Sequence, residues 1–362
     1  MRVAVLANLK INAPTWDGMP PDQWDDLDSE KTIKALIAAL ESAGHSAEFF
    51  EAQITPPHNL IERLSTYKPD ICFNIAESHF GDGREAQIPA ALEMLRIPYT
   101  GSQVMTLALA LDKPMTKRIL HYHGLPTPEF QVFERVDEPI DEDLLDDSGE
   151  LRYPLFVKPS SEGTSMGVSA SSIVRTVPEL REQVAQQLAR YREAVLVEHY
   201  IAGREAMVGM IGNLKATDAR KVNERLIQRV LPPELTFLPI LEMDTQAHAA
   251  TEGDIYTSRM KTQMVDEYRY FCPAPMDEDM AHELRVLAAA TFRVIGCMDV
   301  ARVDFRLDAL NDDKPYILEI NPLPGLSPGF SDLCLQSMAA GWSHEYLINA
   351  ILNQALARYQ MV

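Results

Sequence analysis

The chain has 362 residues, 46% of them hydrophobic, which is enough for two or three domains with their own cores. Its 33 basic and 53 acidic residues give a formal charge of −20, which argues against nucleic acid or an anionic membrane as a partner. No apolar run is long enough to span a membrane, the N-terminus lacks a secretory signal, and the cysteines are scattered, so we expect a cytoplasmic protein with reduced thiols.

The N-terminal third predicts alternating strands and helices. A helix begins after Ser29, which can cap it, and Gly44 is placed to end it; a second helix is predicted at 85–95. Apolar runs predict strands at 2–8, 47–52, 70–77 and 97–101. This order predicts an α/β unit with a parallel sheet covered on both faces. The long loop at 12–28 follows the first strand, at the sheet edge where such folds bind ligands.

The middle of the chain predicts a smaller α+β unit. A helix from about 103 to 122 precedes it, and Pro114 is expected to kink or split that helix. The acidic stretch at 136–150 is interpreted as a solvated surface connection. A helix is then predicted near 178–192. Strands are predicted at 153–159, 168–174 and 194–201.

The C-terminal part predicts a β-hairpin between two helices, whereas residues 202–270 show no clear pattern. The helices are predicted at 277–295 and near 343–358, and the strands at 299–308 and 316–322.

A small-residue loop beside a lysine, KPSSEGTSMGVS at 158–169, is the first candidate for chemistry. Its lysine precedes the glycines, so it does not fit the nucleotide loop in which lysine follows them. The strand pattern resumes after the loop, which predicts the tip of a β-hairpin. Gly163, Thr164, Ser165 and Gly167 can present backbone N–H groups and hydroxyls to an anion, with Lys158 adding a charge. An ordinary flexible turn with a surface lysine is the alternative.

The C-terminal hairpin is the second candidate. If its register is symmetric about the turn NDDKP, Asp304 faces Glu319 and Arg302 faces Asn321 on the same side. Two carboxylates and an amide oxygen suit one or two Mg²⁺ ions, and the arginine suits developing phosphoryl charge. The alternative is a cross-strand salt-bridge ladder. The apolar neighbours indicate burial, however, where facing carboxylates are costly without a cation.

The strand VLVEHYI at 195–201 is the third candidate. Backbone groups at its exit can read the edge of an adenine, and Glu198 or Glu205 can hold amino or ribose hydroxyl groups. A plain strand–turn–strand is the alternative.

Together these stretches resemble the ATP-grasp fold and, within it, the D-alanine–D-alanine ligases. The resemblance rests on ordered motifs and covers most of the chain. They are LDK (111–113), FVKPSSEGTSMGVS (156–169), VLVEHYI, GRE (203–205), ARVDF (301–305) and YILEINPLPGLSP (316–328), with IPYTGS (97–102) and YFCPAP (270–275) in support. The resemblance implies an N-terminal α/β domain at 1–112, a central ATP-grasp lid domain at 113–201 and a C-terminal ATP-grasp domain at 202–362. ATP would lie between the last two domains, and the family also implies a homodimer.

The resemblance also implies roles for individual residues. ATP would be bound by Lys113, Lys158, Gly163, Gly167, Glu198, His199, Tyr200, Ile201, Glu205, Lys261 and Leu318. Mg²⁺ or Mn²⁺ would be held by Asp304, Glu319 and Asn321. Arg302 would stabilise the acyl-phosphate and tetrahedral intermediates, with Thr164 and Ser165 of the lid beside it. A substrate carboxylate would attack the γ-phosphate of ATP, and an amine would then displace phosphate.

The amino-acid side departs from the family. The first loop, ANLKINAPTWDGMP, lacks the family's Gly/Ser-rich motif, and ESHFGDGREAQ at 77–87 replaces its His-Gly segment. Thr164 stands where the family has serine, and Thr262 where it has tyrosine. The phosphate chemistry therefore carries over better than the substrate identity, and the substrates are expected to be amino acids or other small carboxylates and amines.

Two sets of residues are candidates for those substrates. Arg84 could hold a carboxylate and Glu85 an ammonium, with a solvated arginine and a capping acid as the alternative. Gly325, Ser327 and Ser331 could bind the second substrate's carboxylate, although such residues are also ordinary turn formers.

Three functions remain open at this stage. The best single hypothesis is a D-alanine–D-alanine ligase-like enzyme. The same chemistry on another pair of substrates, in specialised metabolism, is the nearest alternative. A non-catalytic ATP-binding regulator is disfavoured, because Arg302, Asp304, Glu319 and Asn321 are all present.

Overall fold

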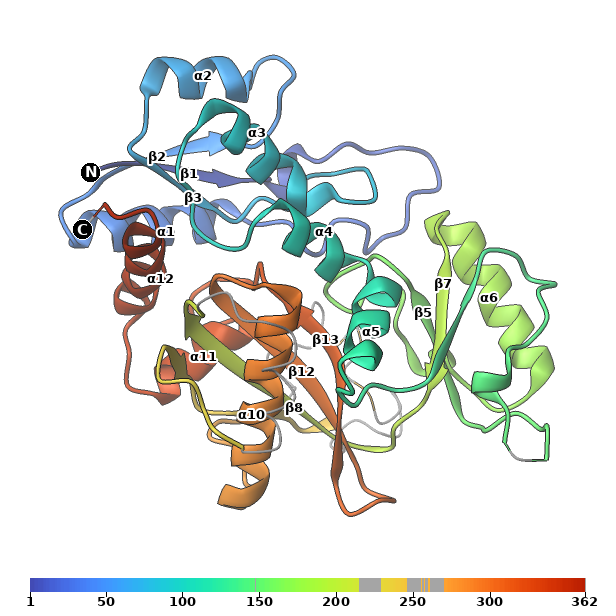
Figure 1. Ribbon diagram of the computed structural model, residues 1–362. Coiled ribbons are helices and arrows are strands. Elements are labelled where there is room, and N and C mark those ends of the chain that lie inside the picture. Colours follow the sequence, from blue (N-terminus) through green and yellow to red (C-terminus); the bar gives the residue numbers. More distant parts are fainter. Residues whose placement is uncertain are drawn as a thin grey trace.

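The computed structural model describes residues 1–146, 148–214, 229–245 and 270–361, together with 255, 257 and 260. Its strands form three sheets. In Figure 1 the N-terminal sheet lies at the top, the largest sheet lies below it, and the domain that contains α6 lies to the right. None of the described helices combines the length and apolar character needed to cross a membrane.

The N-terminal sheet is parallel, as predicted. Its central strand β1 (Arg2–Ala7) pairs with β2 (Ser46–Glu51) and β3 (Ile71–Asn74). Alternate residues of β1 enter two cores: Val3, Val5 and Ala7 pack with α1 (Glu30–Ser42), and Ala4 and Leu6 pack with α2 (Leu60–Tyr67) and α3 (Gln87–Leu95). Burial on both faces explains why this strand is a continuous apolar run.

Two details of this domain differ from the prediction. The strand expected at 97–101 is reduced to one bridge between Cys72 and Tyr99, and helix α2 was not anticipated. The predicted caps of α1 are present: the Ser29 side chain accepts a hydrogen bond from Thr32 N–H, and Gly44 follows the helix with φ of +83°.

Pro114 splits the long helix into α4 (Val104–Leu111) and α5 (Lys113–Tyr122), as the sequence predicted. The proline lies in the first turn of α5, where its missing N–H costs no helical bond. Asp112 joins the two helices, and its side chain accepts a hydrogen bond from Met115 N–H at 2.9 Å. This junction makes Lys113 the first residue of α5.

The central domain is an antiparallel sheet in the order β4-β7-β5-β6. Its strands are β4 (Phe130–Phe133), β5 (Leu155–Pro159), β6 (Ile173–Val174) and β7 (Val195–His199), and α6 (Val177–Tyr191) packs against them. Strand β4 was not predicted. The acidic stretch at 136–150 is mostly exposed, but its Leu144 is fully buried against this sheet.

The strand predicted at 168–174 is wrong over most of its length. Only Ile173 and Val174 pair, with Phe156 and Leu155. Ser169 and Ser172 cap each other in a capping box, which winds the intervening residues into a short 3-10 turn. The loop that begins at Lys158 is therefore a wide lid and not a tight hairpin tip.

The C-terminal sheet runs in the order β11-β10-β8-β12-β13, with β9 also on β8. Its strands are β8 (Gly203–Gly212), β9 (Leu235–Phe237), β10 (Leu241–Met243), β11 (Tyr270–Phe271), β12 (Asp299–Asp308) and β13 (Lys314–Asn321). Helix α10 (Glu278–Ile295) packs against Ala301, Val303 and Phe305 of β12. Alternation along β12 leaves Arg302, Asp304 and Arg306 on the other face, which carries the site.

The last helix returns to the N-terminal domain. Helices α11 (Asp332–Ala339) and α12 (His344–Arg358) enter the same core as β1 and α1. Arg358 Nη2 lies 2.7 Å from Asp299 Oδ2, which also accepts a hydrogen bond from Gly101 N–H. The first and last segments therefore share one core, while the domain boundaries at 112 and 201 stay predictions.

Candidate active site

The hairpin of β12 and β13 has the predicted register at its functional end. Asp304 pairs with Glu319 and Arg302 with Asn321. Toward the turn the register slips by one residue, so that Phe305 pairs with Ile317 and Leu318 is the extra residue of a bulge. Strict alternation would send Leu318 and Glu319 to opposite faces. Because of the bulge, both line the same cavity.

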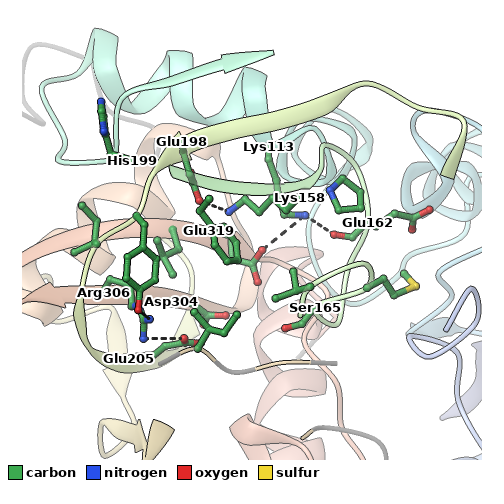
Figure 2. A pocket seen from close by; sticks show the side chains of 18 residues that line it. Lys113, Lys158, Glu162, Ser165, Glu198, His199, Glu205, Asp304, Arg306 and Glu319 are labelled. Carbon is green, nitrogen blue, oxygen red and sulfur yellow. Dashed lines mark hydrogen bonds and ion pairs between the residues drawn. The ribbon is translucent and has the colours of Figure 1, made fainter. Parts of the chain in front are cut away.

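We call that space the lysine cavity. It lies between the central and C-terminal sheets, with Lys113 and Lys158 on its wall (Figure 2). All but three of the residues expected to bind ATP line it. The exceptions are Gly163, Gly167 and Lys261, of which Lys261 lies outside the described residues, as does Thr262.

Buried ion pairs hold the lysines of this cavity. Lys158 Nζ lies 2.6 Å from Glu198 Oε1, and Lys117 Nζ lies 2.7 Å from Glu198 Oε2. Burial lowers the pKa of Lys117 to about 8. Burial alone would raise the pKa of Glu198, but the two lysines bring it below the ordinary value. Lys113 lies 3.7 Å from Glu319 and donates to the Glu162 carbonyl (Figure 2).

The residues that follow Glu198 at the end of β7, from His199 to Ile201, line the lysine cavity. The two ring nitrogens of His199 contact the carbonyl oxygens of Arg152 and Asp143 at 3.1 and 3.2 Å. The ring is therefore held against the chain segment between β4 and β5. Glu205 on β8 lies 3.5 Å from Arg306 on the neighbouring strand β12, and both line the lysine cavity.

We call the adjoining space the acidic cavity, because Asp25, Asp26, Glu77 and Glu85 form its N-terminal wall. It shares Lys113, Glu162 and Glu319 with the lysine cavity, so the two spaces meet at these residues. The lid lies along both: Gly163 and Thr164 line the acidic cavity, whereas Ser165 lines the lysine cavity.

Arg302 faces the acidic cavity and is held by two carboxylates. Its Nε and Nη2 bond Asp304 at 2.7 and 2.8 Å, and its Nη1 lies 3.2 Å from Asp332. Asn321 Nδ2 also donates to Asp304, at 3.1 Å. Burial raises the pKa of Asp304, Arg302 opposes the rise, and Glu319 adds to it. The donor set predicted from sequence is thus brought together, with Arg302 already in contact with it.

The predicted substrate residues separate into two groups. Glu85, Gly325 and Ser331 line the acidic cavity, whereas Ser327 does not. The Ser331 hydroxyl accepts a hydrogen bond from Ser327 N–H at 3.0 Å, and a side chain at Gly325 would come within 2.8 Å of that hydroxyl. The two serines therefore fix the turn around Gly325.

Arg84 lines neither the lysine cavity nor the acidic cavity. Its Nη2 bonds Asp26 at 2.8 Å and its Nη1 bonds the Ser161 carbonyl at 2.9 Å, and the side chain is buried. The guanidinium thereby joins the 12–28 loop to the exit of β5. A role of Arg84 in holding a substrate carboxylate stays a prediction.

The 12–28 loop also binds the lid. Asp22 accepts hydrogen bonds from Gly167 N–H at 3.1 Å and from the Tyr191 hydroxyl, and it lies 2.8 Å from Arg190. Burial would raise the pKa of Asp22, but these three partners lower it overall. Thr164 and Ser165 adopt left-handed φ values of 50° and 56°, which is strained for side-chain-bearing residues.

Residues 119–231 and 238–353 match the family model described as D-ala D-ala ligase C-terminus. The chain belongs to the D-alanine–D-alanine ligase family. It is an ATP-dependent ligase of this type, which forms a C–N bond. It is 33% identical to the D-alanine–D-alanine ligase of Janthinobacterium sp. (strain Marseille) over 322 residues, 89% of each chain. It is also 33% identical to uncharacterized protein y4sG of Sinorhizobium fredii over 374 aligned residues, 99% of this chain and 98% of that one.

The fold of this ligase matches a solved structure of the same family. The crystal structure of D-alanine–D-alanine ligase from Bacillus anthracis complexed with ATP superposes with a TM-score of 0.69. The two sequences are 20% identical, and the match covers 100% of this chain and 99% of the other. The predicted ATP-grasp fold is thereby confirmed.

Several residues of the ligase's site were missed by sequence reasoning. Lys117 lies one helical turn after Lys113, a spacing that usually indicates an exposed charge, and only the fold shows its burial. Asp332 begins the unpredicted helix α11, where an acidic first turn is common. Glu77 stood at the end of a predicted strand, and Asp22 lay in a loop without a motif.

Proposed function

We propose that this ligase activates a substrate carboxylate with ATP where its two cavities meet and then joins it to an amine. The observation that carries the proposal is the shared wall of Lys113, Glu162 and Glu319 between the lysine cavity and the acidic cavity. A phosphoryl group bound beside Lys113 would lie at the boundary of the space that Arg302 faces. Carboxylate, phosphate and amine would thereby be held together for in-line transfer.

ATP would occupy the lysine cavity. Lys113 and Lys158 would bind its phosphates, and Ser165 of the lid would close over them. The backbone at His199, Tyr200 and Ile201 would meet the adenine, with Leu318 packing on the base. Glu205 would reach the ribose. Glu198 is better suited to holding Lys158 and Lys117 than to binding adenine, because a lysine contacts each of its carboxylate oxygens.

Asp304, Glu319 and Asn321 fit a magnesium or manganese ion by the chemistry of their donors. All are hard oxygen ligands, and the two carboxylates are paired across the strands. Within the described chain no group of three His, Cys, Asp or Glu side chains is placed to bind a metal, so phosphate oxygens and water would complete the coordination. A bound ion would neutralise phosphate charge.

Arg302 would stabilise the negative charge of the acyl-phosphate and of the tetrahedral adduct formed by the amine. Its contacts with Asp304 and Asp332 fix its orientation before substrate arrives, which lowers the cost of reorganisation during the reaction. Thr164, at the lid's acidic-cavity end, would lie beside the same intermediates.

The relatives' names make D-alanine the first substrate to test, in both positions. A different dipeptide or amide is the second candidate, favoured by Glu77 and Glu85 in the acidic cavity and by the replaced first loop. The homodimer and the cytoplasmic location implied by the family stay predictions.

The experiment is ADP release from the purified enzyme with magnesium, ATP and pairs of amino acids of both configurations, with the product identified by mass. We expect ADP release that depends on both a carboxylate and an amine substrate. ATP turnover that ignores both would contradict the proposal.

A further inference from the structure

The acidic cavity holds more negative charge than the protein's own cations balance. Two of its described lining residues, Lys113 and Arg302, are basic. Seven are acidic: Asp25, Asp26, Glu77, Glu85, Glu162, Glu319 and Asp332. Five of the seven lie within ion-pair distance of a lysine or arginine (Lys10, Arg84, Lys113 or Arg302). The remaining two have no lysine or arginine within ion-pair distance in the described chain.

That pair is Glu77 and Glu85. Neither makes a hydrogen bond or an ion pair with a described residue, although both line the cavity. Glu77 follows β3, and Glu85 lies in the short turn before α3, so both belong to the N-terminal wall. Burial and the neighbouring Glu85 raise the pKa of Glu77 well above its usual range, and burial raises the pKa of Glu85 to about 7, although the positive charge of Arg84 opposes both rises. Two carboxylates in this setting call for a cation.

Asp26 gives a second, independent observation on the same wall. Its side chain is 7% exposed, and its Oδ2 bonds Arg84. Its Oδ1 is buried and has no hydrogen-bond partner among the described residues. A buried acceptor without a donor is costly. A ligand that brings N–H donors into the cavity would satisfy this oxygen as well.

We propose that the acidic cavity binds an amino acid with a second cationic group, whose two cations lie among Glu77, Glu85 and Asp26. The proposal rests on the ligase function above. One α-ammonium needs one carboxylate, whereas this wall offers two unpaired carboxylates and a free oxygen. The substrate's carboxylate would point to Lys113 and Arg302, beside the bound phosphates. An ion held by Asp304, Glu319 and Asn321 would offset charge on β12 and β13, which form a different wall.

The first test uses the unmodified enzyme with magnesium and ATP. D-Alanine is compared with diaminopropionate, diaminobutyrate, ornithine and lysine of both configurations, singly and in pairs, by ADP release and product mass. We expect at least one diamino acid to exceed D-alanine in kcat/KM by about tenfold or more, the gain typical of one added charge-assisted hydrogen bond.

The second test uses Glu77→Gln and Glu85→Gln, which keep the shape and remove the charge. We expect kcat/KM for the diamino acid to fall by about 10- to 100-fold, with the KM for ATP unchanged. Because each change removes a partly buried carboxylate without an ion-pair partner, the melting temperature of the free enzyme should stay level or rise. Glu62→Gln, on the exposed face of α2, is the matched control and should change neither quantity.

Two results would overturn the inference. If D-alanine or another mono-ammonium amino acid is preferred, and both variants keep that kcat/KM, the second-cation proposal fails while the ligase function stands. If no carboxylate in the panel stimulates ADP release, the proposed function fails with it.

Discussion

The two cavities of this ligase differ in how their charges are balanced. In the lysine cavity, Glu198 and Glu205 each contact a lysine or arginine, and Lys113 and Lys158 lie on the wall. In the acidic cavity, Glu77 and Glu85 have no such partner in the described chain. If the lysine cavity binds ATP as proposed, its paired carboxylates need no further cation from an amino-acid substrate. An unbalanced site indicates that the missing charge arrives with the substrate, so specificity is to be sought on the N-terminal wall.

The largest effect is expected from Arg302→Ala, which removes the arginine that faces the acidic cavity beside Asp304. Loss of a preorganised donor to a developing oxyanion typically lowers kcat about 10²- to 10³-fold. The KM for ATP should change little, because Arg302 does not line the lysine cavity. Steady-state ADP release and ATP binding measure both quantities. Arg135→Ala, a strongly exposed site, is the control, and an unchanged kcat in Arg302→Ala would refute the assigned role.

Lys117→Met tests whether the buried ion pairs of Glu198 stabilise the folded protein. Removal of this buried cation leaves Glu198 with Lys158 alone, and we expect the free energy of unfolding to fall by about 1–3 kcal/mol. Adding Glu198→Gln should recover part of that loss. Urea unfolding provides the measurement, with the exposed Lys34→Met as the control. Equal stability of wild type and Lys117→Met would show that the pair is not coupled.

Leu318→Ala tests the bulge on β13. If Leu318 packs on the base of ATP, the KM for ATP should rise about tenfold, which corresponds to loss of about half of a leucine's burial. The KM values of the amino acids should stay the same. Leu310→Ala, at the exposed turn of the same hairpin, is a matched control. If only the KM values of the amino acids rise, Leu318 acts on the amino-acid substrates, and its proposed packing on the base of ATP is refuted.

Asp22→Asn is expected to have the smallest effect. It weakens the contacts of the 12–28 loop with Gly167 and Arg190, and Arg190 is partly exposed, so we expect about a threefold rise in the KM for ATP. Limited proteolysis of the lid should become faster. Asp17→Asn, an exposed site in the same loop, is the comparison. Equal rates of lid cleavage in the two variants would show that the Asp22 contacts do not hold the lid.

The hairpin of β12 and β13 could largely be predicted from the sequence. The register of β12 and β13 followed from symmetry about their turn, so Asp304, Glu319, Arg302 and Asn321 were correctly placed. The bulge at Leu318 was invisible, because no local signal marks one extra residue in a strand.

Other positions differ from their local pattern because side-chain contacts override it. The serines at 169 and 172 cap each other and replace a strand with a turn. Arg84 was expected to face substrate, and only the fold brings Asp26 and the Ser161 carbonyl to it. Burial of Lys117 also depends on the central sheet packing over α5, which its helical spacing does not reveal.

The central claim is that a substrate carboxylate takes the γ-phosphate of ATP before the amine attacks. The most direct test supplies the carboxylate substrate with oxygen-18 in both carboxyl oxygens and analyses the released phosphate by mass. Attack through an acyl-phosphate predicts one labelled oxygen in the phosphate for each amide bond formed. Amide formation with unlabelled phosphate would contradict the account.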